Sequence, residues 1–207
     1  MQLCELIAPA THTANLPALI LRFFLLLALL LAAPFFAGCR HNDPTPERAA
    51  AAATQATAPL VLSSSSLQNS QYPRQFTCDG EDSSPSLAWT AAPPATKSLV
   101  LTVTDPDAST FTHWVLYNLP ASASSLPANV PKQDQLPDGS RQGRNDFGKI
   151  GYAGPCGPHG STHRYFFDLF ALNSTLDLPA GATRTQIEDA MNTHVLARGK
   201  LMARYSR

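Results

Sequence analysis

Short apolar runs alternate with polar, turn-forming segments from Leu60 to Arg207. Runs of roughly four to eight residues that are rich in β-branched and aromatic side chains and bounded by Gly, Pro, Asn or Ser are typical of β-strands. The clearest run is Ser98–Thr104, in which every residue after the serine is Leu, Val or Thr. The same pattern predicts further strands at 60–62, 87–89, 111–120, 165–172 and 200–207.

The predicted strand at 111–120 has two faces, because successive strand residues point to opposite sides. We expect one face to carry His113, Val115 and Tyr117, and the other to carry Trp114, Leu116 and Asn118. An imidazole within such an apolar run is either a hydrogen-bonded core histidine or part of a site.

One helix is predicted after the last long loop. Thr183-Arg184-Thr185-Gln186 matches a capping box, in which the Thr hydroxyl and the Gln side chain each accept a backbone N–H of the other residue. Ile187, Met191 and Val195 follow at helical spacing, and Gly199 is the predicted end of the helix. Because strands outnumber helices, we predict a mainly β domain with one or two peripheral helices.

The residues before Leu60 resemble a targeting segment and a linker. Leu19–Ala33 is apolar apart from Arg22, and small residues precede Cys39, which together indicate a secretory signal. The Ala-Gly-Cys sequence at Cys39 resembles a bacterial lipobox, in which the cysteine is acylated and begins the mature protein. A plain signal peptide or an anchor helix is the alternative. We predict a lipoprotein-type signal peptide at 1–38, an Ala/Pro-rich linker at 39–59 and a folded domain at 60–207.

This leader predicts an exported protein that is anchored in the bacterial cell envelope through lipid on Cys39, with its domain in the periplasm. An oxidising compartment permits disulfides. Cys78 and Cys156 are the two cysteines of the predicted domain, so they could pair and join two loops. Two unpaired thiols are the alternative.

Charge and composition narrow the possible functions. The chain has 15 basic and 15 acidic residues, so it lacks the overall positive charge of a nucleic-acid-binding protein. Any site for an anion must therefore be local. Only 14% of the residues are charged and 18 are proline, which favours a loop-rich β domain over a helical bundle.

Glycine and proline are concentrated in and just before the segment Arg144–Tyr165. Six of the eleven glycines lie between Gly143 and Gly160, a composition that disfavours a helix or a central strand. The segment ends in His163-Arg164-Tyr165, directly before a predicted strand. We interpret it as a loop that forms one wall of a ligand pocket.

Titratable side chains fall at the ends of the predicted strands. Asp105 and Asp107 follow one strand, His113 begins the next, and His163 and Tyr165 follow the glycine-rich loop. If these strands are neighbours, the imidazoles, the phenol and loop amides can donate to phosphate oxygens, while a carboxylate orients the imidazoles. Each residue has a structural alternative, with Asp105 as a turn residue, His113 as a core residue and Arg164 as a structural hydrogen-bond donor.

Several of these segments resemble the phosphatidylethanolamine-binding protein family. The shared motifs are Asp105-Pro106-Asp107-Ala108, the run from His113 to Asn118, Gly154-Pro155 and His163-Arg164-Tyr165. Further segments resemble its bacterial, Raf-kinase-inhibitor-like branch, namely Thr77-Cys78-Asp79-Gly80, Ser84-Pro85 and Gly143-Arg144-Asn145-Asp146-Phe147-Gly148. Ser109 and Gly157 stand where the family and its bacterial branch often have proline.

The resemblance implies a β-sandwich with a small pocket that accepts phosphate, acetate or a phospholipid headgroup. It places ligand-binding residues at Asp105, His113, Gly154, Pro155, His163 and Tyr165, with Asp107 adjacent. We therefore expect a non-enzymatic binding protein without cofactor, metal or catalytic residues. Its expected partners are a small anion or headgroup and, through the lipid anchor, the membrane.

Two other functions remain open. Relatives that inhibit kinases or proteases imply a protein-interaction module, which in the envelope would inhibit a protease or another enzyme. Two histidines and two aspartates could also bind a divalent metal or catalyse phosphoester hydrolysis. The sequence contains neither H-E-x-x-H nor G-x-S-x-G, so these zinc-enzyme and serine-hydrolase motifs are absent.

Overall fold

The computed structural model describes residues 59–207. The predicted signal peptide at 1–38, Cys39 and the linker up to residue 58 lie outside the described residues, so export and lipidation stay predictions. Within residues 59–207, every helix is too short or too polar to cross a membrane.

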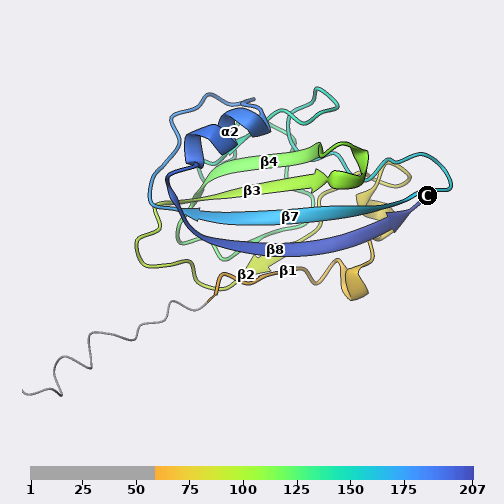
Figure 1. Cartoon of the computed structure of the whole chain (residues 1–207), viewed down its shortest axis with the longest axis horizontal. Helices are drawn as coiled ribbons and strands as arrows, with labels where there is room; N and C mark the ends of the chain where they lie inside the picture. Colours follow the sequence, from red (N-terminus) through yellow and green to blue (C-terminus); the bar gives the residue numbers. More distant parts are fainter. Residues whose placement is uncertain (1–58) are drawn as a thin grey trace, which may run out of the picture. The chain divides into compact units, whose positions relative to one another are not determined.

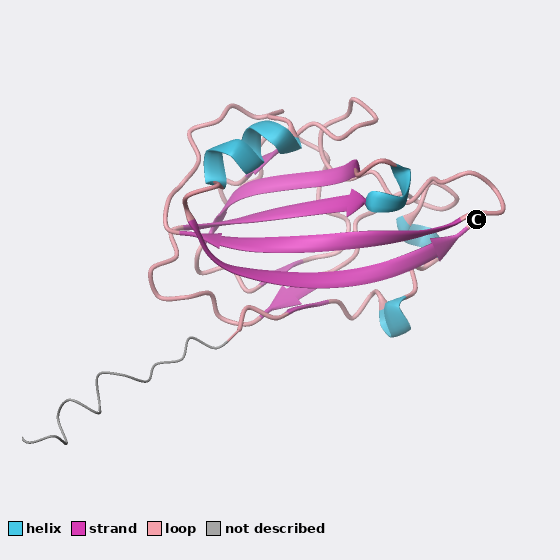
Figure 2. Cartoon of the chain, in the orientation of Figure 1, coloured by secondary structure: helices cyan, strands magenta, loops and turns pink. Residues whose placement is uncertain are grey.

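Residues 59–207 contain eight β-strands in two antiparallel sheets (Figures 1 and 2). The larger sheet has the order β6-β4-β3-β7-β8, formed by β3 (Ser98–Asp105), β4 (Phe111–Pro120), β6 (Arg141–Gln142), β7 (Thr162–Leu172) and β8 (Val195–Ser206). The smaller sheet has the order β1-β2-β5, formed by β1 (Leu62–Ser63), β2 (Leu87–Trp89) and β5 (Ser125–Leu126).

Helices are few in the described part of the chain. It contains one α-helix, α2 (Arg184–Met191), and three 3-10 helices, η1 (Gln68–Ser70), η2 (Arg74–Phe76) and η3 (Pro106–Ala108). Helix α2 packs Ile187 and Met191 against one face of the larger sheet. The predicted mainly β fold with peripheral helix is therefore confirmed.

The main core lies between the two sheets. Removal of apolar surface from water stabilises this arrangement, since side chains of both sheets contribute to one buried cluster. The smaller sheet contributes Leu62, Leu87, Trp89 and Leu126, and the larger sheet contributes Leu99, Leu101, Val103, Trp114, Leu116, Phe167 and Leu169. A second cluster lies beneath α2, on the opposite face of the larger sheet.

A β-bulge in β4 changes the direction of His113. Val103 of β3 pairs with Trp114, but the next residue, Thr104, pairs with Thr112. His113 is therefore an extra residue on β4, and an extra residue shifts the alternation of side chains between the two faces of the strand.

The bulge separates His113 from the residues with which it was predicted to share a face. The His113 ring contacts Tyr165 of the main core, with ring centroids 5.1 Å apart. Val115 and Tyr117 instead lie in the cluster beneath α2. The predicted common face of these three residues is wrong, because a strict two-residue period fails across the bulge.

Asn118 also lies on the opposite face of β4 from the face that was predicted for it. A second shift in the pairing of β3 and β4 occurs at this position, where Asn118 has a φ of 57°. Its side-chain amide donates to the Leu176 carbonyl at 2.9 Å and accepts the Leu176 N–H at 2.8 Å. Leu176 belongs to the cluster beneath α2, so Asn118 does not share a face with Trp114 and Leu116.

The predicted helix begins as expected but ends early. Thr183 accepts the Gln186 N–H and Gln186 accepts the Thr183 N–H, so the capping box is confirmed. The helix ends at Met191, and Val195 begins β8 with 41% of its surface exposed. Backbone pairing of β8 with β7 replaces the extra helical turn, so the prediction that Val195 lies on the helix is wrong.

Gly199 lies inside β8 and does not end a helix. A Cβ atom at this position would lie 2.7 Å from the carbonyl oxygen of Leu60. The glycine is needed because the backbone near β1 passes directly over β8 here.

Candidate binding site

Asp105 is the last residue of β3, and only 3% of its side chain is exposed. Its Oδ1 atom accepts the backbone N–H of Asp107 at 2.9 Å, which caps η3. Its Oδ2 atom lies 2.6 Å from Nδ1 of His163 on the neighbouring strand β7. Because both carboxylate oxygens are bound, Asp105 has a fixed position and orients the His163 ring.

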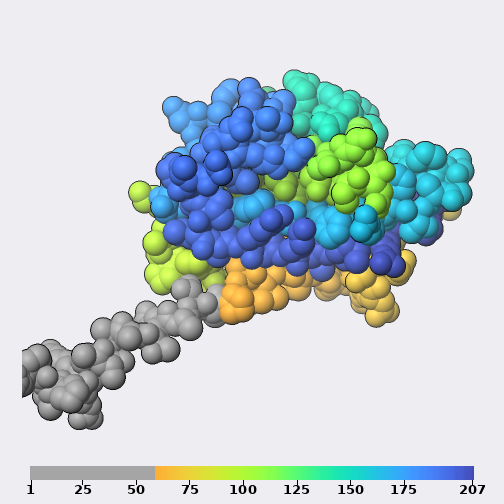
Figure 3. All heavy atoms as spheres, in the orientation of Figure 1, coloured from red at the N-terminus to blue at the C-terminus, as the bar shows by residue number. Residues whose placement is uncertain are grey.

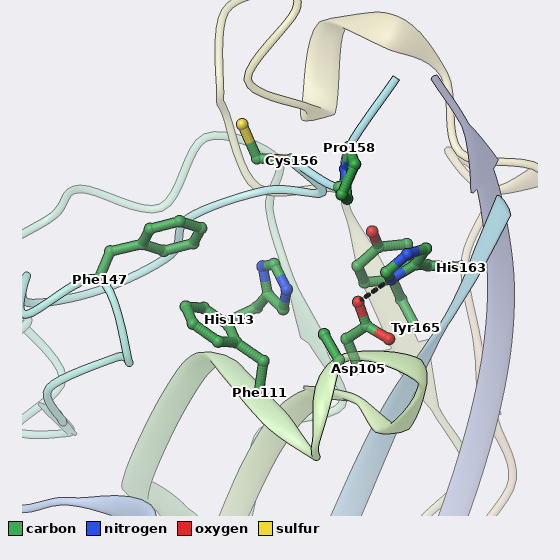
Figure 4. Close-up of a pocket in the computed structure, with 10 residues that line it drawn as sticks. Asp105, Phe111, His113, Phe147, Cys156, Pro158, His163 and Tyr165 are labelled. Carbon is green, nitrogen blue, oxygen red and sulfur yellow. Dashed lines mark hydrogen bonds and ion pairs between the residues drawn. The ribbon is translucent and has the colours of Figure 1, made fainter. Parts of the chain in front are cut away.

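The His163 ring lies near the start of β7, with 13% of its side chain exposed (Figure 4). Since Nδ1–H donates to Asp105, the other ring nitrogen, Nε2, is left for a ligand. Among residues 59–207, Nε2 has no hydrogen-bond partner. Gly157 keeps the space beside it open, because a Cβ at Gly157 would lie 3.4 Å from Nε2.

The bulge turns His113 toward the same cavity. Its Nδ1 atom lies 2.7 Å from the carbonyl oxygen of Ala153, to which Nδ1–H donates. Burial lowers the pKa of His113, and the Ala153 carbonyl and the Asp105 charge only partly oppose this effect. The ring is therefore neutral at pH 7, and its Nε2 atom is a hydrogen-bond acceptor.

Tyr165 provides a third polar group. Its ring packs edge-on against His113, and its hydroxyl has no partner in the described part of the chain. Burial raises the pKa of Tyr165, and the carboxylates of Asp105 and Asp107 raise it further. The phenol therefore stays protonated at neutral pH and can donate a hydrogen bond.

These groups line a cavity of about 190 Å³ between the turn after β3 and the glycine-rich loop (Figure 4). In Figure 3 the turn (green) and the loop (cyan) both lie at the surface at this end of the domain. The remaining lining residues are mostly apolar or small, namely Ala108, Phe111, Phe147, Cys156, Gly157 and Pro158. The cavity thus has a few polar atoms within an apolar wall, as small-molecule sites usually do.

Of the seven predicted ligand-binding residues, the structure places Asp105, His113, His163 and Tyr165 around the cavity and leaves Asp107, Gly154 and Pro155 outside its lining. Asp107 binds Arg164, with Nη2 of Arg164 2.6 Å from its Oδ1 and Nε 3.0 Å from its Oδ2. These hydrogen bonds lower the pKa of Asp107 to about 2. Arg164 therefore makes structural hydrogen bonds, which was the alternative interpretation of this residue.

Gly154 and Pro155 support the glycine-rich loop. The Gly154 N–H donates to Oδ1 of Asp82 at 2.6 Å, and the Pro155 carbonyl accepts the Cys78 N–H at 3.1 Å. A Cβ atom at Gly154 would lie 2.1 Å from the carbonyl oxygen of Phe76. The glycine is therefore required by the close approach of two backbones.

We expect Gly154→Ala to lower the free energy of unfolding by about 2 kcal/mol, because the added methyl must displace backbone atoms of Phe76. Urea denaturation of the full chain measures this loss. Gly157→Ala is the matched control, since its methyl would approach the side chains of Ser161 and His163 and not a backbone. Equal losses at the two glycines would contradict the structural role of Gly154.

Phe111 and Phe147 form the apolar wall, and sequence analysis assigned neither to the site. Their ring centroids lie 4.7 Å apart, and the His113 ring lies within 5.7 Å of both. The side chain of Asn145 accepts the N–H groups of Phe147 and Lys149 at 3.1 Å each, which holds the turn that carries Phe147. The sequence signal that could have identified Phe147 is a large aromatic residue within a turn of Gly and Asn residues.

Cys78 and Cys156 form a disulfide, with their Cα atoms 5.4 Å apart. The bond connects the acidic loop after η2 to the wall of the cavity, because Cys156 is a lining residue. Within residues 59–207, no group of three or more His, Cys, Asp and Glu side chains is arranged to hold a metal ion. The metal-dependent alternative gains no support from this region.

The fold and the site together define a class of protein, namely an antiparallel two-sheet domain with a small cavity at the ends of its strands. The chain belongs to the phosphatidylethanolamine-binding protein family, whose model matches residues 63–206. The predicted family is confirmed by this match.

Relatives support the same assignment. The UPF0098 protein of Methanothermobacter thermautotrophicus is 50% identical over 139 residues, which cover 66% of this chain and 91% of the relative. The crystal structure of Escherichia coli YbcL, a member of the mammalian PEBP family, matches with a TM-score of 0.67 and 31% identity over 72% of this chain and 99% of that chain. The homologue CT736 of Chlamydia trachomatis matches with a TM-score of 0.65 and 34% identity, over 72% of this chain and 98% of that chain.

Proposed function

We propose that this domain is a non-enzymatic binding protein whose cavity takes a phosphate group that carries a proton, either as inorganic phosphate or as a phosphate monoester. The observation that carries the proposal is that His113, His163 and Tyr165 line one small cavity, and that each has a polar atom left for a ligand, namely Nε2 of each imidazole and the Tyr165 hydroxyl (Figure 4). Each of these atoms is without a hydrogen-bond partner among residues 59–207.

The hydrogen-bonding roles of the three groups match such a ligand. The Tyr165 hydroxyl donates, and Nε2 of His163, whose Nδ1 is bound to Asp105, is left for a contact with the ligand. Neutral His113 accepts at Nε2, because its Nδ1–H is bound to Ala153. A protonated phosphate offers both acceptor oxygens and a P–OH donor, whereas sulfate and phosphodiesters offer acceptors alone.

Cavity size and composition support binding without catalysis. About 190 Å³ is below the range of roughly 300–1,000 Å³ that drug-sized ligands occupy, so the ligand is small. The lining contains no Ser or Thr, and its cysteine is bonded to Cys78, so the cavity lacks a serine, a threonine or a free cysteine that could act as a nucleophile.

Phosphate is expected to raise the Tm of the full chain, because a ligand that binds the native state at about 100 times its Kd adds roughly 2.7 kcal/mol of stability. For a domain of this size that corresponds to a rise of about 5–10 °C. His163→Ala should abolish the rise. His194→Ala is the matched control, since His194 is partly exposed, binds Asn173 and lies outside the cavity lining.

Sulfate at equal ionic strength separates specific binding from the general stabilising effect of such salts. Two further ligands test whether the cavity prefers a phosphate monoester or a lipid headgroup, whose phosphate is esterified twice. Phosphoethanolamine is a monoester, and glycerophosphoethanolamine is a diester. We expect the monoester to stabilise the protein more than the diester. A wild-type Tm that responds equally to phosphate and sulfate would refute the proposal.

A further inference from the structure

The Cys78–Cys156 disulfide lies between two cavities. Cys156 lines the cavity proposed for phosphate and also a second cavity of about 240 Å³, which Cys78 lines as well. Both cysteine residues are exposed. A small molecule in the second cavity can therefore reach the disulfide, and access is a main determinant of whether a disulfide reacts.

A guanidinium group lies beside one of the two sulfur atoms. Nη1 of Arg207 lies 3.8 Å from Sγ of Cys156 and donates to the Gly157 carbonyl at 3.1 Å. Nε and Nη2 of the same side chain bind Oδ1 of Asp79 at 3.1 and 3.0 Å, which holds the guanidinium in place. A fixed positive charge at this distance stabilises negative charge on the Cys156 sulfur when the disulfide opens.

The second cavity also carries a positive charge. Lys149 lines it and has no ion pair among residues 59–207. The carboxylate in this cavity, Asp82, is already bound to the Gly154 N–H at 2.6 Å and to Nζ of Lys132 at 2.7 Å. Lys149 therefore favours an anionic molecule in the cavity.

We propose that the second cavity is a thiol–disulfide exchange site that takes small anionic thiols, with Cys78 as the attacked residue and Cys156 as the leaving group. The proposal rests on the accessible disulfide, on the position of Arg207 beside Cys156, and on Lys149 in the cavity. It does not depend on phosphate binding.

The exchange is balanced as follows. The thiolate sulfur of the incoming thiol forms a bond to Sγ of Cys78 while the Cys78–Cys156 bond breaks, and the electron pair of that bond leaves on Sγ of Cys156. A second molecule of the thiol then attacks the mixed disulfide at the sulfur that came from the first thiol. This attack releases Cys78 as a thiolate. Two thiols are oxidised to one disulfide, and the two cysteines are reduced.

Opening the disulfide also affects the first cavity. Cys156, Gly157 and Pro158 form part of its wall, and they lose their covalent link to the loop that carries Cys78. We therefore expect the affinity for phosphate to change when the disulfide is reduced. This expectation rests on the proposed function. Exchange rates and phosphate-dependent shifts are separate measurements, so one can fail while the other succeeds.

The test compares 2-mercaptoethanesulfonate, which is anionic, with cysteamine, which is cationic, on the folded full chain. Each rate is divided by the rate of the same thiol with a small model disulfide, and products are trapped by alkylation and located by peptide mass spectrometry. We expect the adduct on Cys78, and we expect the anionic thiol to react about threefold or more faster than the cationic one.

Substitutions identify the contribution of each charge. Arg207→Gln should slow the reaction of both thiols by about threefold or more, and Arg207→Lys should restore most of the rate. Lys149→Gln should remove the preference for the anionic thiol. Arg204→Gln and Lys97→Gln are matched controls without contact to the disulfide, and they should react as the wild type does.

Three results would overturn the proposal. The first is an adduct on Cys156 instead of Cys78. The second is an Arg207→Gln variant that reacts as fast as the wild type or faster. The third is a wild-type rate equal to the rate of global unfolding, measured separately by urea jump, because the folded protein would then be unreactive.

Discussion

Replacing Cys78 and Cys156 together with alanine is expected to lower the free energy of unfolding by about 4 kcal/mol. The two residues are 78 positions apart, so the bond closes a long loop and restricts the unfolded chain. In a domain of this size the loss corresponds to a fall in Tm of about 10 °C. Urea denaturation of the full chain, followed by fluorescence, measures the change.

Noncovalent contacts between the two loops do not replace the disulfide. They include the hydrogen bond from the Cys78 N–H to Pro155 and the contacts of Arg207 with Asp79 and Gly157. Single noncovalent contacts of this kind each contribute about 1 kcal/mol. His159→Ala is the matched control, because His159 is an exposed residue of the same glycine-rich segment and its replacement keeps the disulfide. A double variant within about 1 kcal/mol of the wild type would contradict the stabilising role of the bond.

Asp105→Ala is expected to lower the free energy of unfolding by about 3 kcal/mol and to abolish the phosphate-dependent rise in Tm. The substitution removes the acceptor for Nδ1–H of His163 and for the Asp107 N–H. The Asp105 side chain that accepts both is nearly buried. Without that acceptor His163 loses its orientation. Thermal unfolding with and without phosphate measures both effects.

Two aspartate variants provide the controls for this prediction. Asp105→Asn keeps the shape and one acceptor oxygen, so it should retain part of the stability while losing the charge beside His163. Asp107→Asn breaks a pair with Arg164 that is partly exposed, so it should cost about 1 kcal/mol or less and leave the phosphate response intact. If Asp105→Ala keeps the phosphate response, Asp105 is not the positioning residue of the site.

The polar residues of the cavity could be predicted from the sequence because they follow local patterns. Asp105 follows the clearest apolar run, Ser98–Thr104, and His163 lies at the end of the glycine-rich segment. Asp105 and Asp107 could not be distinguished in this way, because they are two residues apart and have the same side chain. The turn of η3 separates them, since it leaves Asp105 buried at the strand end and turns Asp107 outward to Arg164.

The apolar part of the cavity escaped prediction for a different reason. Phe111, Phe147 and Pro158 come from a strand and two loops, and no periodic pattern connects them. Their common position depends on how β4 pairs with β3 and on where the loops lie. Pairing between strands follows from contacts along the whole sheet, which a single segment does not contain.

Amino-acid order alone was enough to locate most strands, the start of α2, the glycine-rich loop and the four polar residues of the cavity. Apolar alternation, capping and the cost of glycine in regular structure act over a few neighbouring residues, so they are visible in one segment. The folded chain was needed to show that His113 faces Tyr165 and that Gly154 supports a backbone crossing. These features arise from a one-residue bulge and from contacts between distant segments, and local sequence patterns predict neither of them.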